Sequence, residues 1–589
     1  MSRFVALAAR PWVAVLLLVL VYMGVALTLD ERAYLGTDTG AKVAALRALE
    51  GTDLAGPDLG YWAEEYDPEG TVHAFYYVDQ FEEGWFDLST LPLVYAAYPL
   101  WRLGGYKATL VIPALAAAVA AAAVVALVKR LGGRGGRAFW LAGLGTPLFV
   151  YALDLWDHAP GLALLLCATV LLVDISEGRR GVAWGLLVGV GVGVAATMRT
   201  EALLYGAALT GAVSLRLLVA GPFDDEPSEE DGAAGRGRDD TVNSVRTRLG
   251  RGIGLGVLAL VGLIPPLVLN AMAERAVLGS DLRVDRTSGI AQSAGSGLEQ
   301  RLDEGLRTLV GLPGLDPREA AIIGGLAVIL LAVGLRSWGR RDDRLPQVAV
   351  VGWAAVLLLS LRDGLGFVPG LLTASPLAVL GVALLRRATG PAALLGGVAL
   401  GALPLVWLTQ FLGGAAPQWG ARYALLSGLL LTVVALANLD HVAPGAQRAV
   451  AVAAVVITLL GVSWTYQRSH EFGRMGLAIA EADGVVISRV AHFLRENGWH
   501  YSPDRRWLTA LGVEEERTAF AVAAASDAAL VTVVELDGGD VNEVRDDRRR
   551  GEGWRRIDER SFFLFDDIEV RFASYARDQP ARASAAPSA

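Results

Sequence analysis

The sequence predicts a mainly α-helical protein in which a bundle of transmembrane helices carries a small α/β domain. Three observations indicate this fold class. Of the 589 residues, 53% are hydrophobic and only 19% are charged, a balance typical of chains that bury apolar surface in lipid. Apolar runs of about 15–24 residues recur along most of the chain, and each is long enough to cross ~30 Å of hydrocarbon. After residue 465 these runs stop, and strand and helix patterns alternate.

The apolar runs predict about thirteen transmembrane helices. The first run is too long for the core of a signal peptide and lacks a small-residue cleavage site, so we expect it to be retained. The predicted spans are residues 11–29, 108–127, 138–153, 159–173, 181–198, 202–220, 252–273, 320–335, 347–361, 365–385, 389–412, 423–439 and 449–464.

Basic residues predict the orientation of these spans. If the spans alternate, the arginines and lysines beside them gather on one side, which the positive-inside rule assigns to the cytoplasm. The N-terminus is then cytoplasmic, and an odd number of spans places the tail outside the plasma membrane of a multi-pass protein. The residues concerned are Arg3, Arg10, Lys129, Arg130, Arg134, Arg137, Arg179, Arg180, Arg336, Arg340, Arg341, Arg386 and Arg387.

Four segments outside the apolar runs complete the domain organisation. We expect a transmembrane module over residues 1–465, an extracytoplasmic α/β domain over 466–580 and a disordered tail over 581–589. Within the module, the loops are a first outer loop (30–107), a second outer loop (274–318) and a cytoplasmic stretch (221–251). This stretch is acidic and then rich in Gly, Arg and Asp, so it is predicted to be disordered.

Local patterns predict secondary structure in the first loop and in the tail. Residues 41–49 have a helical pattern, and residues 88–103 favour an amphipathic helix lying along the membrane surface. The tail predicts strands at 484–488, 529–535 and 561–565, with a helix at 489–496.

Composition excludes some functions. A net charge of −9 does not favour a nucleic-acid partner. The one cysteine, Cys167, lies in an apolar span. The extracytoplasmic domain therefore has no disulfide and no cysteine-based metal or redox site.

Polar side chains at the predicted outer ends of spans are the candidate functional residues. Asp38 stands in the segment Gly-Thr-Asp-Thr-Gly just beyond the first span. Three later turns on the same predicted side place charge within a residue or two of an apolar run, where burial is costly without a partner or a water-filled cavity. These turns carry Asp157 and His158, then Arg199 and Glu201, then Arg422 and Tyr423.

Each of these residues also has a purely structural explanation. Asp38 precedes a helical pattern and is a candidate N-cap. Arg199 and Glu201 are expected to neutralise each other or a neighbour, and Asp157 and His158 to pair with each other or with Arg199. Arg422 beside Tyr423 fits an arginine that snorkels to the membrane surface. Two tryptophans in these turns, Trp156 and Trp419, fit the interfacial aromatic belt.

The order and sidedness of these motifs resemble those of the GT-C membrane glycosyltransferases, in particular the aminoarabinose transferases and the protein mannosyltransferases. The shared features are an early aspartate in a long outer loop, a Trp-acid-His turn, an Arg-x-Glu turn, an Asn270…Gly279 segment and Gly420-x-Arg422-Tyr423 before a late span. Two features depart from the pattern. Asp38 is flanked by threonines where the family often has paired acids, and no proline-containing stretch follows Tyr423. The subfamily therefore stays open.

The resemblance implies transfer of a sugar, with inversion, from a polyprenyl-phosphate carrier to a hydroxyl of a glycan, lipid or protein on the outer face. Asp38 is the expected general base, because a phosphate already leaves readily and one base suffices. Arginine suits the departing phosphate, since its planar fork binds two oxygens and keeps its charge. Arg422 is the first candidate for that role and Arg199 the second, with Tyr423 and Glu201 beside them and Lys42 and Lys107 as further contributors.

Asp157 and His158 are expected to orient the acceptor or the carrier, or to hold a divalent cation. Two ligands are too few to define a metal site, so the cation stays an open alternative and no other cofactor is implied. No Gly-rich loop precedes a helix, which disfavours a nucleotide-sugar donor.

Two other classes stay open. A polytopic lipid or glycan flippase or transporter would need charged or broken helices near the bilayer midplane. The prolines that would break helices are Pro147, Pro265, Pro266, Pro376 and Pro404. A non-catalytic scaffold would account for the outer tail but not for the matched polar turns.

Overall fold

The structure, a computed structural model, divides into two compact units. The first unit is drawn from Met1–Ala26, Leu110–Met272 and Arg283–Ser463, and the second from Leu27–Thr109, Ala273–Leu282 and Trp464–Ala589. The first outer loop was expected to belong to the transmembrane module, but it folds with the tail. The residues described are 11–34, 36–52, 56–87, 91–223, 238–279, 305, 308–311, 345–360, 369–409, 419–536, 553–565 and 568–577.

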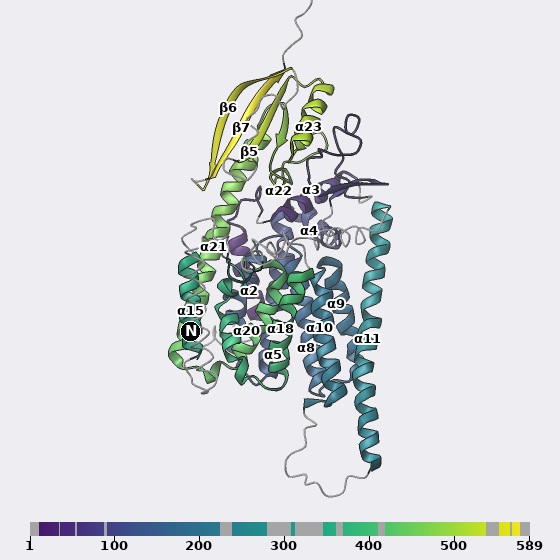
Figure 1. Ribbon diagram of the computed structural model, residues 1–589, viewed down its shortest axis with the longest axis vertical. Coiled ribbons are helices and arrows are strands. Elements are labelled where there is room, and N and C mark those ends of the chain that lie inside the picture. Colours follow the sequence, from purple (N-terminus) through teal and green to yellow (C-terminus); the bar gives the residue numbers. More distant parts are fainter. Residues whose placement is uncertain are drawn as a thin grey trace, which may run out of the picture. The chain divides into compact units, whose positions relative to one another are not determined.

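The first unit is a helical bundle (Figure 1). Its helices are α2 (Pro11–Ala26), α5 (Val111–Arg130), α6 (Gly135–Leu144), α7 (Leu148–Tyr151), α8 (His158–Ser176), α9 (Gly185–Met198), α10 (Glu201–Val219), α11 (Arg238–Leu278), α15 (Leu345–Ser360), α16 (Leu371–Ala374), α17 (Pro376–Leu384), α18 (Gly390–Thr409), α20 (Leu425–Ala437) and the first part of α21 (Pro444–Ala480). Short 3₁₀ turns, η1 (Val182–Trp184), η4 (Leu385–Arg387) and η5 (Arg422–Ala424), lie beside α9, α17 and α20.

Several of these helices have the length and the apolar composition of membrane spans. Within the described residues, six helices are long and apolar enough to cross a bilayer, and four shorter helices are also apolar. A polytopic membrane fold is therefore present. The predicted span at 320–335 lies outside the described residues. In the stretch predicted to be disordered, α11 begins at Arg238, so that prediction is wrong for residues 238–251.

Proline breaks two of the predicted spans. Residues 138–153 form α6 and α7 instead of one helix, with Pro147 at the start of α7, because proline has no N–H for the helical ladder. Residues 365–385 likewise contain two helices, and the Ser375 hydroxyl accepts a hydrogen bond from the Ala378 amide at the start of α17. These two apolar runs are therefore not single helices, and in the part of the chain that the structure describes none of their helices is among those long and apolar enough to cross a bilayer.

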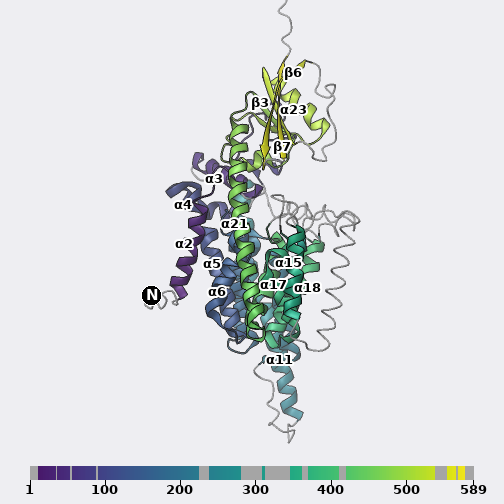
Figure 2. The same cartoon turned by 90° about the vertical axis from the view of Figure 1, so that its left-hand side faces the viewer.

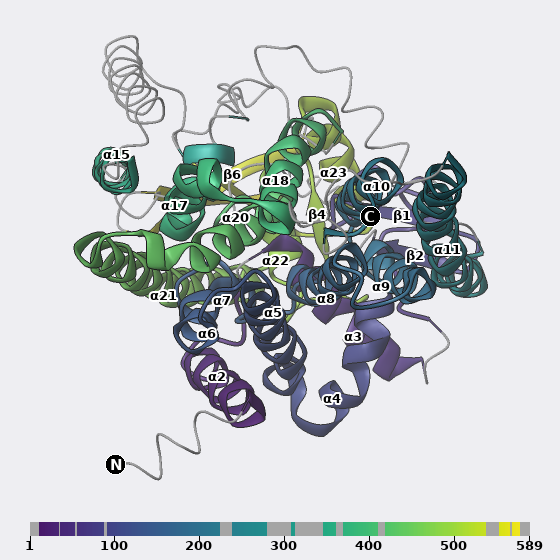
Figure 3. The same ribbon diagram turned by 90° about the horizontal axis from the view of Figure 1, so that it is seen from below.

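Small residues let the helices approach closely. A Cβ added at Gly189 would lie 1.9 Å from the Ala259 carbonyl oxygen, and one at Gly262 would lie 2.0 Å from that of Leu186. Helices α9 and α11 thus pack backbone against backbone, as is common between helices in membranes. Helix α5 packs against α2, α6 and α8. Figure 3 shows these neighbours end-on, and Figure 2 shows α2, α5 and α6 from the side.

The second unit is built on a five-stranded sheet with the strand order β4-β3-β5-β7-β6. The first three strands pair in parallel and the last two antiparallel. The strands are β3 (Val485–Ser488), β4 (Trp507–Thr509), β5 (Leu530–Leu536), β6 (Trp554–Leu564) and β7 (Ile568–Arg577), with helices α22 (Phe493–Glu496) and α23 (Val513–Ala525) between them. The α/β character predicted for the tail is confirmed, although β4, β7 and α23 were not predicted.

The first loop contributes α3 (Thr37–Gly51), the hairpin β1 (Val78–Phe81) and β2 (Gly84–Asp87), and α4 (Leu91–Thr109) to this unit. Its backbone bonds directly to the sheet, because the Thr509 amide donates to the Val72 carbonyl over 3.1 Å. Tyr61 and Trp85 of the loop share one hydrophobic core with Leu508 of the tail. Segments more than 400 residues apart in sequence therefore form a single core.

Candidate functional site

Asp157, Arg199 and Glu201 form a buried ionic cluster in the first unit. The Arg199 Nε donates to a Glu201 carboxylate oxygen over 2.9 Å, and its Nη1 donates to Asp157 Oδ1 over 3.4 Å. The His158 Nδ1 lies 3.3 Å from the same Asp157 oxygen. All four side chains are less than one tenth exposed. The sequence-based pairings of Arg199 with Glu201 and of Asp157 with His158 or Arg199 are confirmed.

The helix ends position this cluster. Asp157 immediately precedes α8, yet its side chain makes no capping hydrogen bond, so the carboxylate is available to Arg199. Arg199 ends α9 in an extended conformation, and Glu201 is the first residue of α10. The short turn between α9 and α10 therefore carries Arg199 and Glu201, and Asp157 meets the arginine from the start of α8.

Arg422 and Tyr423 join the cluster from η5, before α20. The Tyr423 ring lies 4.8 Å from the Arg199 guanidinium carbon and 5.2 Å from that of Arg422, within the range of cation–π attraction. The preceding Gly420 has φ +78°, and a Cβ there would lie 2.4 Å from Pro147 Cγ. Glycine at this position of the motif lets the chain turn close to Pro147 and carry Arg422 to the cluster.

A small cavity of about 10 Å³ lies at these residues, room for about one water molecule. Its lining is divided. One part is polar, with His158, Arg199, Glu201 and Arg422, and the rest is largely apolar. The apolar part includes Leu162, Leu165, Leu425 and Leu426. An ionic group and a hydrocarbon chain thus find matching surfaces in one place.

Arg199 stays charged despite its burial. Burial opposes the positive charge, but the neighbouring carboxylates of Glu201 and Asp157 outweigh it and raise the pKa of Arg199. Within the described part of the chain, the Arg199 Nη2 has no hydrogen-bond partner. The cluster therefore has a permanently charged donor with unused capacity.

The structural explanation given for the two tryptophans, an interfacial aromatic belt, does not hold for either of them. Trp156 is 1% exposed and packs against Tyr151 and His158. Trp419 is 3% exposed. Neither side chain belongs to an interfacial belt facing lipid headgroups. Trp156 is instead part of the packing beside His158, and Trp419 lies against Gly461 of α21.

Asp38 lies in the second unit and is not an N-cap. Helix α3 begins at Thr37, and its N-cap is Gly36. The Asp38 carboxylate instead accepts a hydrogen bond of 2.9 Å from the Arg495 Nη1. Its side chain keeps 24% of its surface exposed, whereas that of Arg495 keeps 4%. Asp38 is therefore paired on one side and accessible on the other.

Arg495 is shared between two acids. It donates through Nε and Nη2 to both oxygens of Asp87 over 2.7 and 2.8 Å, the two-pronged geometry that arginine favours with carboxylates. Burial opposes its charge, but Asp87 and Asp38 together raise the pKa of Arg495. Burial and the charge of Arg495 in turn lower the pKa of His492.

Close packing of α3 on α22 brings Asp38 to Arg495. A Cβ at Gly40 would lie 2.0 Å from the Arg495 carbonyl oxygen, and one at Gly498 would lie 1.8 Å from the Gly40 carbonyl oxygen. Only glycine fits at both positions. The second glycine of the Gly-Thr-Asp-Thr-Gly segment is thus explained by the approach of two backbones.

The two lysines also lie in the second unit. Lys42 follows Asp38 by four residues on α3, which places both on one helix face, and it is 1% exposed. The Lys107 ammonium donates to the Leu29 carbonyl over 2.6 Å, and burial lowers the pKa of Lys107. The structure thus groups Asp157, His158, Arg199, Glu201, Arg422 and Tyr423 in one unit, and Asp38, Lys42 and Lys107 in the other.

The side chains near Asp157 and His158 give little support to the alternative that these two residues hold a divalent cation. Among the described residues, no group of three or more His, Cys, Asp or Glu side chains is arranged to hold a metal ion. The one oxygen near His158, Asp157 Oδ1, also faces the positive charge of Arg199, which would compete with a cation for it.

Sequence reasoning missed Arg495 and Asp87, the partners of Asp38. Asp87 ends β2 of a hairpin that was not predicted, and Arg495 lies in α22, 457 residues after Asp38. A single sequence carries no signal for a pairing at that distance. The available hint was local, since Gly40, the second glycine of the Gly-Thr-Asp-Thr-Gly segment, marks a close approach.

No family model matches the chain, and no curated protein sequence is similar to it. Solved structures are similar. The oligosaccharyltransferase of Archaeoglobus fulgidus in complex with Zn and sulfate has 12% identity and a TM-score of 0.42, covering 88% of this chain and 67% of that one. ArnT from Cupriavidus metallidurans in the apo state has 14% identity and a TM-score of 0.36, covering 90% and 93%.

A third similar structure is the same Archaeoglobus enzyme tethered to an acceptor peptide with the NVT sequon, at 11% identity and a TM-score of 0.39, covering 90% of this chain and 69% of that one. These proteins are GT-C glycosyltransferases, the class that the sequence motifs resemble. Each TM-score lies below 0.5, so the function proposed below depends on the residues of the chain itself.

Proposed function

We propose that the chain is a membrane glycosyltransferase that moves a sugar from a polyprenyl-phosphate donor to an acceptor hydroxyl on the extracytoplasmic face. The observation that carries the proposal is the divided lining around Arg199. The cavity lining combines two arginines, two tyrosines, Glu201 and His158 with four leucines. A polyprenyl phosphate has the same division between an anionic head and a hydrocarbon chain. The cavity is smaller than a phosphate, so the donor displaces side chains when it binds.

Arg199 is proposed to bind the phosphate that leaves. Its Nη2 is the donor without a partner in the described residues, and its charge is secured by Glu201 and Asp157. Arg422 adds a second positive charge next to Tyr423. The negative charge that grows on the phosphate as the bond to the sugar breaks is then met by donors already in place, which is the most effective form of electrostatic catalysis.

Asp38 is proposed to act as the general base. The acceptor oxygen forms a bond with the anomeric carbon, the bond from that carbon to the phosphate oxygen breaks, and the electron pair leaves with the phosphate. The acceptor proton passes to Asp38. Attack from the face opposite the phosphate inverts the anomeric configuration. The acceptor is a hydroxyl of a cell-envelope glycan, lipid or protein, and the second unit is proposed to lie outside with the N-terminus in the cytoplasm of a plasma-membrane protein.

The test is sugar transfer in proteoliposomes from synthetic polyprenyl-phosphate sugars to a panel of acceptor hydroxyls, followed by determination of the product's anomeric configuration. Transfer with inversion supports the proposal, and the same sugar offered as a nucleotide sugar should not react. A retained configuration, or transfer from the nucleotide sugar, would overturn the mechanism.

A lipid or glycan flippase is the second candidate, because the helix breaks at Pro147 and at Ser375 are of the kind that transporters use. The same proteoliposomes discriminate between the two. A flippase moves the labelled polyprenyl-phosphate sugar between leaflets without an acceptor and leaves its glycosyl bond intact.

A further inference from the structure

A second polar cluster lies at the other end of α8 from Asp157 and His158. Asp174, in the last turn of α8, is 16 residues beyond His158, or ~24 Å along the helix. That distance is close to the thickness of the hydrocarbon core of a membrane. The two polar clusters of the first unit therefore lie at opposite surfaces of the bilayer, and the second one is not part of the proposed transferase site.

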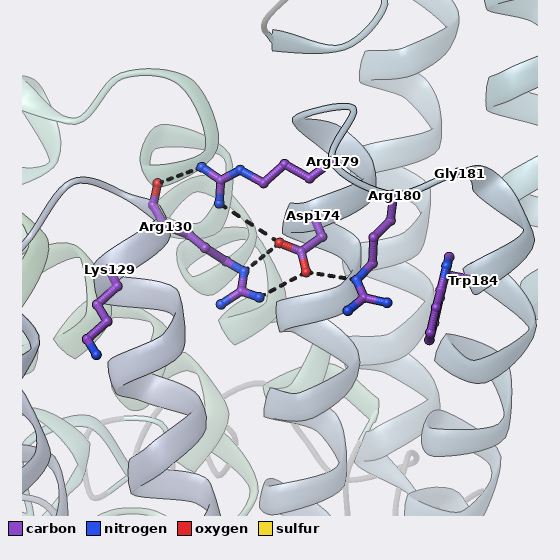
Figure 4. A pocket seen from close by; sticks show the side chains of 7 residues that line it. All are labelled: Lys129, Arg130, Asp174, Arg179, Arg180, Gly181 and Trp184. Carbon is purple, nitrogen blue, oxygen red and sulfur yellow. Dashed lines mark hydrogen bonds and ion pairs between the residues drawn. The ribbon is translucent and has the colours of Figure 1, made fainter. Parts of the chain in front are cut away.

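Basic side chains surround Asp174 in an open cleft of about 620 Å³. Figure 4 shows Arg130, Arg179 and Arg180 converging on its carboxylate, with Lys129 and Trp184 at the two sides. The Arg130 Nε and Nη2 donate to the two Asp174 oxygens over 2.5 and 2.9 Å, and the Arg180 Nε donates over 3.1 Å. The arginines come from the end of α5 and from the loop before η1, so the cleft lies between three helix ends.

The charges in this cleft do not balance. Four cationic side chains line the cleft, and Asp174 is the acidic side chain among its lining residues. A second acid, Glu177, forms an ion pair with the Arg179 Nη1 over 3.1 Å. Lys129 makes no ion pair within the described part of the chain. Two positive charges are therefore left over. A cluster that existed only to pair with Asp174 would not need the second pair of cations or the open volume.

Apolar side chains continue from the cleft toward the middle of the bilayer. Trp184 is 40% exposed and lies 4.0 Å from the Arg180 guanidinium carbon. Two and three residues further along, on α9, Leu186 and Leu187 are 41% and 49% exposed. A ring at the interface with leucines beyond it is the arrangement expected where a lipid places its headgroup at the basic residues and its acyl chains along the helix.

We propose that this cleft binds the phosphate-bearing headgroup of an anionic membrane lipid. Arg179, Arg180 and Lys129 contact the phosphate, Arg130 holds Asp174 in place beneath it, and Trp184 supports the glycerol region. The site is separate from the transferase chemistry and would anchor the α5–α8–α9 part of the bundle at that membrane surface. A soluble phosphate would lack the contact with Trp184 and the leucines.

The test measures lipid binding by the full chain in nanodiscs of phosphatidylcholine that contain a fixed share of phosphatidylglycerol. Lipid that remains bound after release from the disc is counted by native mass spectrometry. The variant Arg179→Gln/Arg180→Gln is expected to weaken phosphatidylglycerol binding roughly thirtyfold, from about 1 kcal/mol for each basic residue near an anionic lipid surface. Lys129→Gln, which breaks no ion pair with Asp174, is expected to weaken it roughly fivefold on the same basis.

The matched control is Arg386→Gln/Arg387→Gln, a second pair of adjacent arginines at a helix end, in η4. This pair should leave phosphatidylglycerol binding unchanged. Equal losses in both double variants, or no loss with Lys129→Gln, would overturn the proposal in favour of general attraction to the membrane surface. Inorganic phosphate in excess should not displace the lipid, and displacement would show a site for a free anion.

Discussion

The two buried arginines at the centre of the proposed chemistry, Arg199 and Arg495, both lie between two carboxylates, yet their surroundings differ. Arg495 donates to both oxygens of Asp87 and to one oxygen of Asp38, whose side chain keeps 24% of its surface exposed. Arg199 faces Asp157 and Glu201 with Arg422 nearby, which makes the formal sum zero, and its Nη2 has no partner within the described residues.

The difference assigns opposite roles to the two clusters. A carboxylate that is 24% exposed suits a group that takes up a proton. A charged donor with unused capacity suits a group that receives an anion. Similar residues in a similar count are thus proposed to serve as a base in one unit and as a phosphate site in the other, and the predictions below test that division.

The largest effect is expected from Asp38→Asn. An amide keeps the hydrogen bond to Arg495 but cannot accept a proton, so the rate of transfer should fall by roughly 10²–10⁴. The measurement is kcat for transfer from a polyprenyl-phosphate sugar, with thermal unfolding as the check on the fold. Full activity in the folded variant would remove Asp38 as the base.

Asp87→Asn is the matched comparison for that variant. Asp87 carries the two-pronged pair with Arg495, and its side chain is 1% exposed. Removing its charge should cost about 3–5 kcal/mol of stability, because a buried arginine loses its main partner. The expected contrast is a stable, inactive Asp38 variant and a destabilised Asp87 variant.

Arg199→Lys is expected to have the next largest effect. Lysine keeps the charge but loses the planar fork that bonds Glu201, Asp157 and a phosphate at once. The kcat should fall roughly 100-fold, as when one preorganised donor to a developing anion is removed. The control is Arg216→Lys on α10, whose guanidinium lies over Phe223, and which should transfer sugar normally. An unchanged kcat in Arg199→Lys would assign the cluster to structure alone.

Arg495→Lys should reduce kcat roughly tenfold, because one lysine cannot bond both oxygens of Asp87 and also orient Asp38. The comparison is Arg489→Lys in the same unit, which pairs with Glu516 and Glu535 and should lower stability alone. If both variants lose activity to the same degree, Arg495 acts only through the stability of the unit.

The last prediction concerns stability and pH, and it is expected to leave the rate of transfer near neutral pH unchanged. Burial lowers the pKa of His73 from 6.5 to about 4, and its Nδ1 accepts a hydrogen bond from the Phe75 amide. Because the folded pKa is depressed, the stabilisation is complete above pH 6.5 and is lost as the pH falls toward 4. The loss amounts to about 3 kcal/mol. Unfolding of the full chain followed by tryptophan fluorescence measures it, and His73→Gln should flatten this part of the pH dependence. An unaltered slope would contradict the assignment.

The membrane segments were predictable because a run of apolar residues long enough to cross the bilayer can be recognised from its own sequence, without knowledge of its neighbours. The breaks at Pro147 and Ser375 were not, because they depend on packing against neighbouring helices. In the site, the Arg199–Glu201 pair could be predicted, since two residues at that spacing meet in any tight turn. The partnership of Asp38 with Arg495 could not, because it depends on the first loop folding onto the tail.

That long-range fold has a consequence for how the protein is made. The Thr509 hydroxyl bonds to the Ala74 carbonyl across 435 residues of sequence. At synthesis rates of about 5–20 residues per second, the first loop waits roughly 20–90 s for its partner strand. Tyr61, Val72 and Trp85, all buried in the finished core, have no sheet to cover them during that time. Folding of the second unit therefore ends only when the chain's last strands are made. Before then, a chaperone that binds exposed apolar segments would bind the first loop.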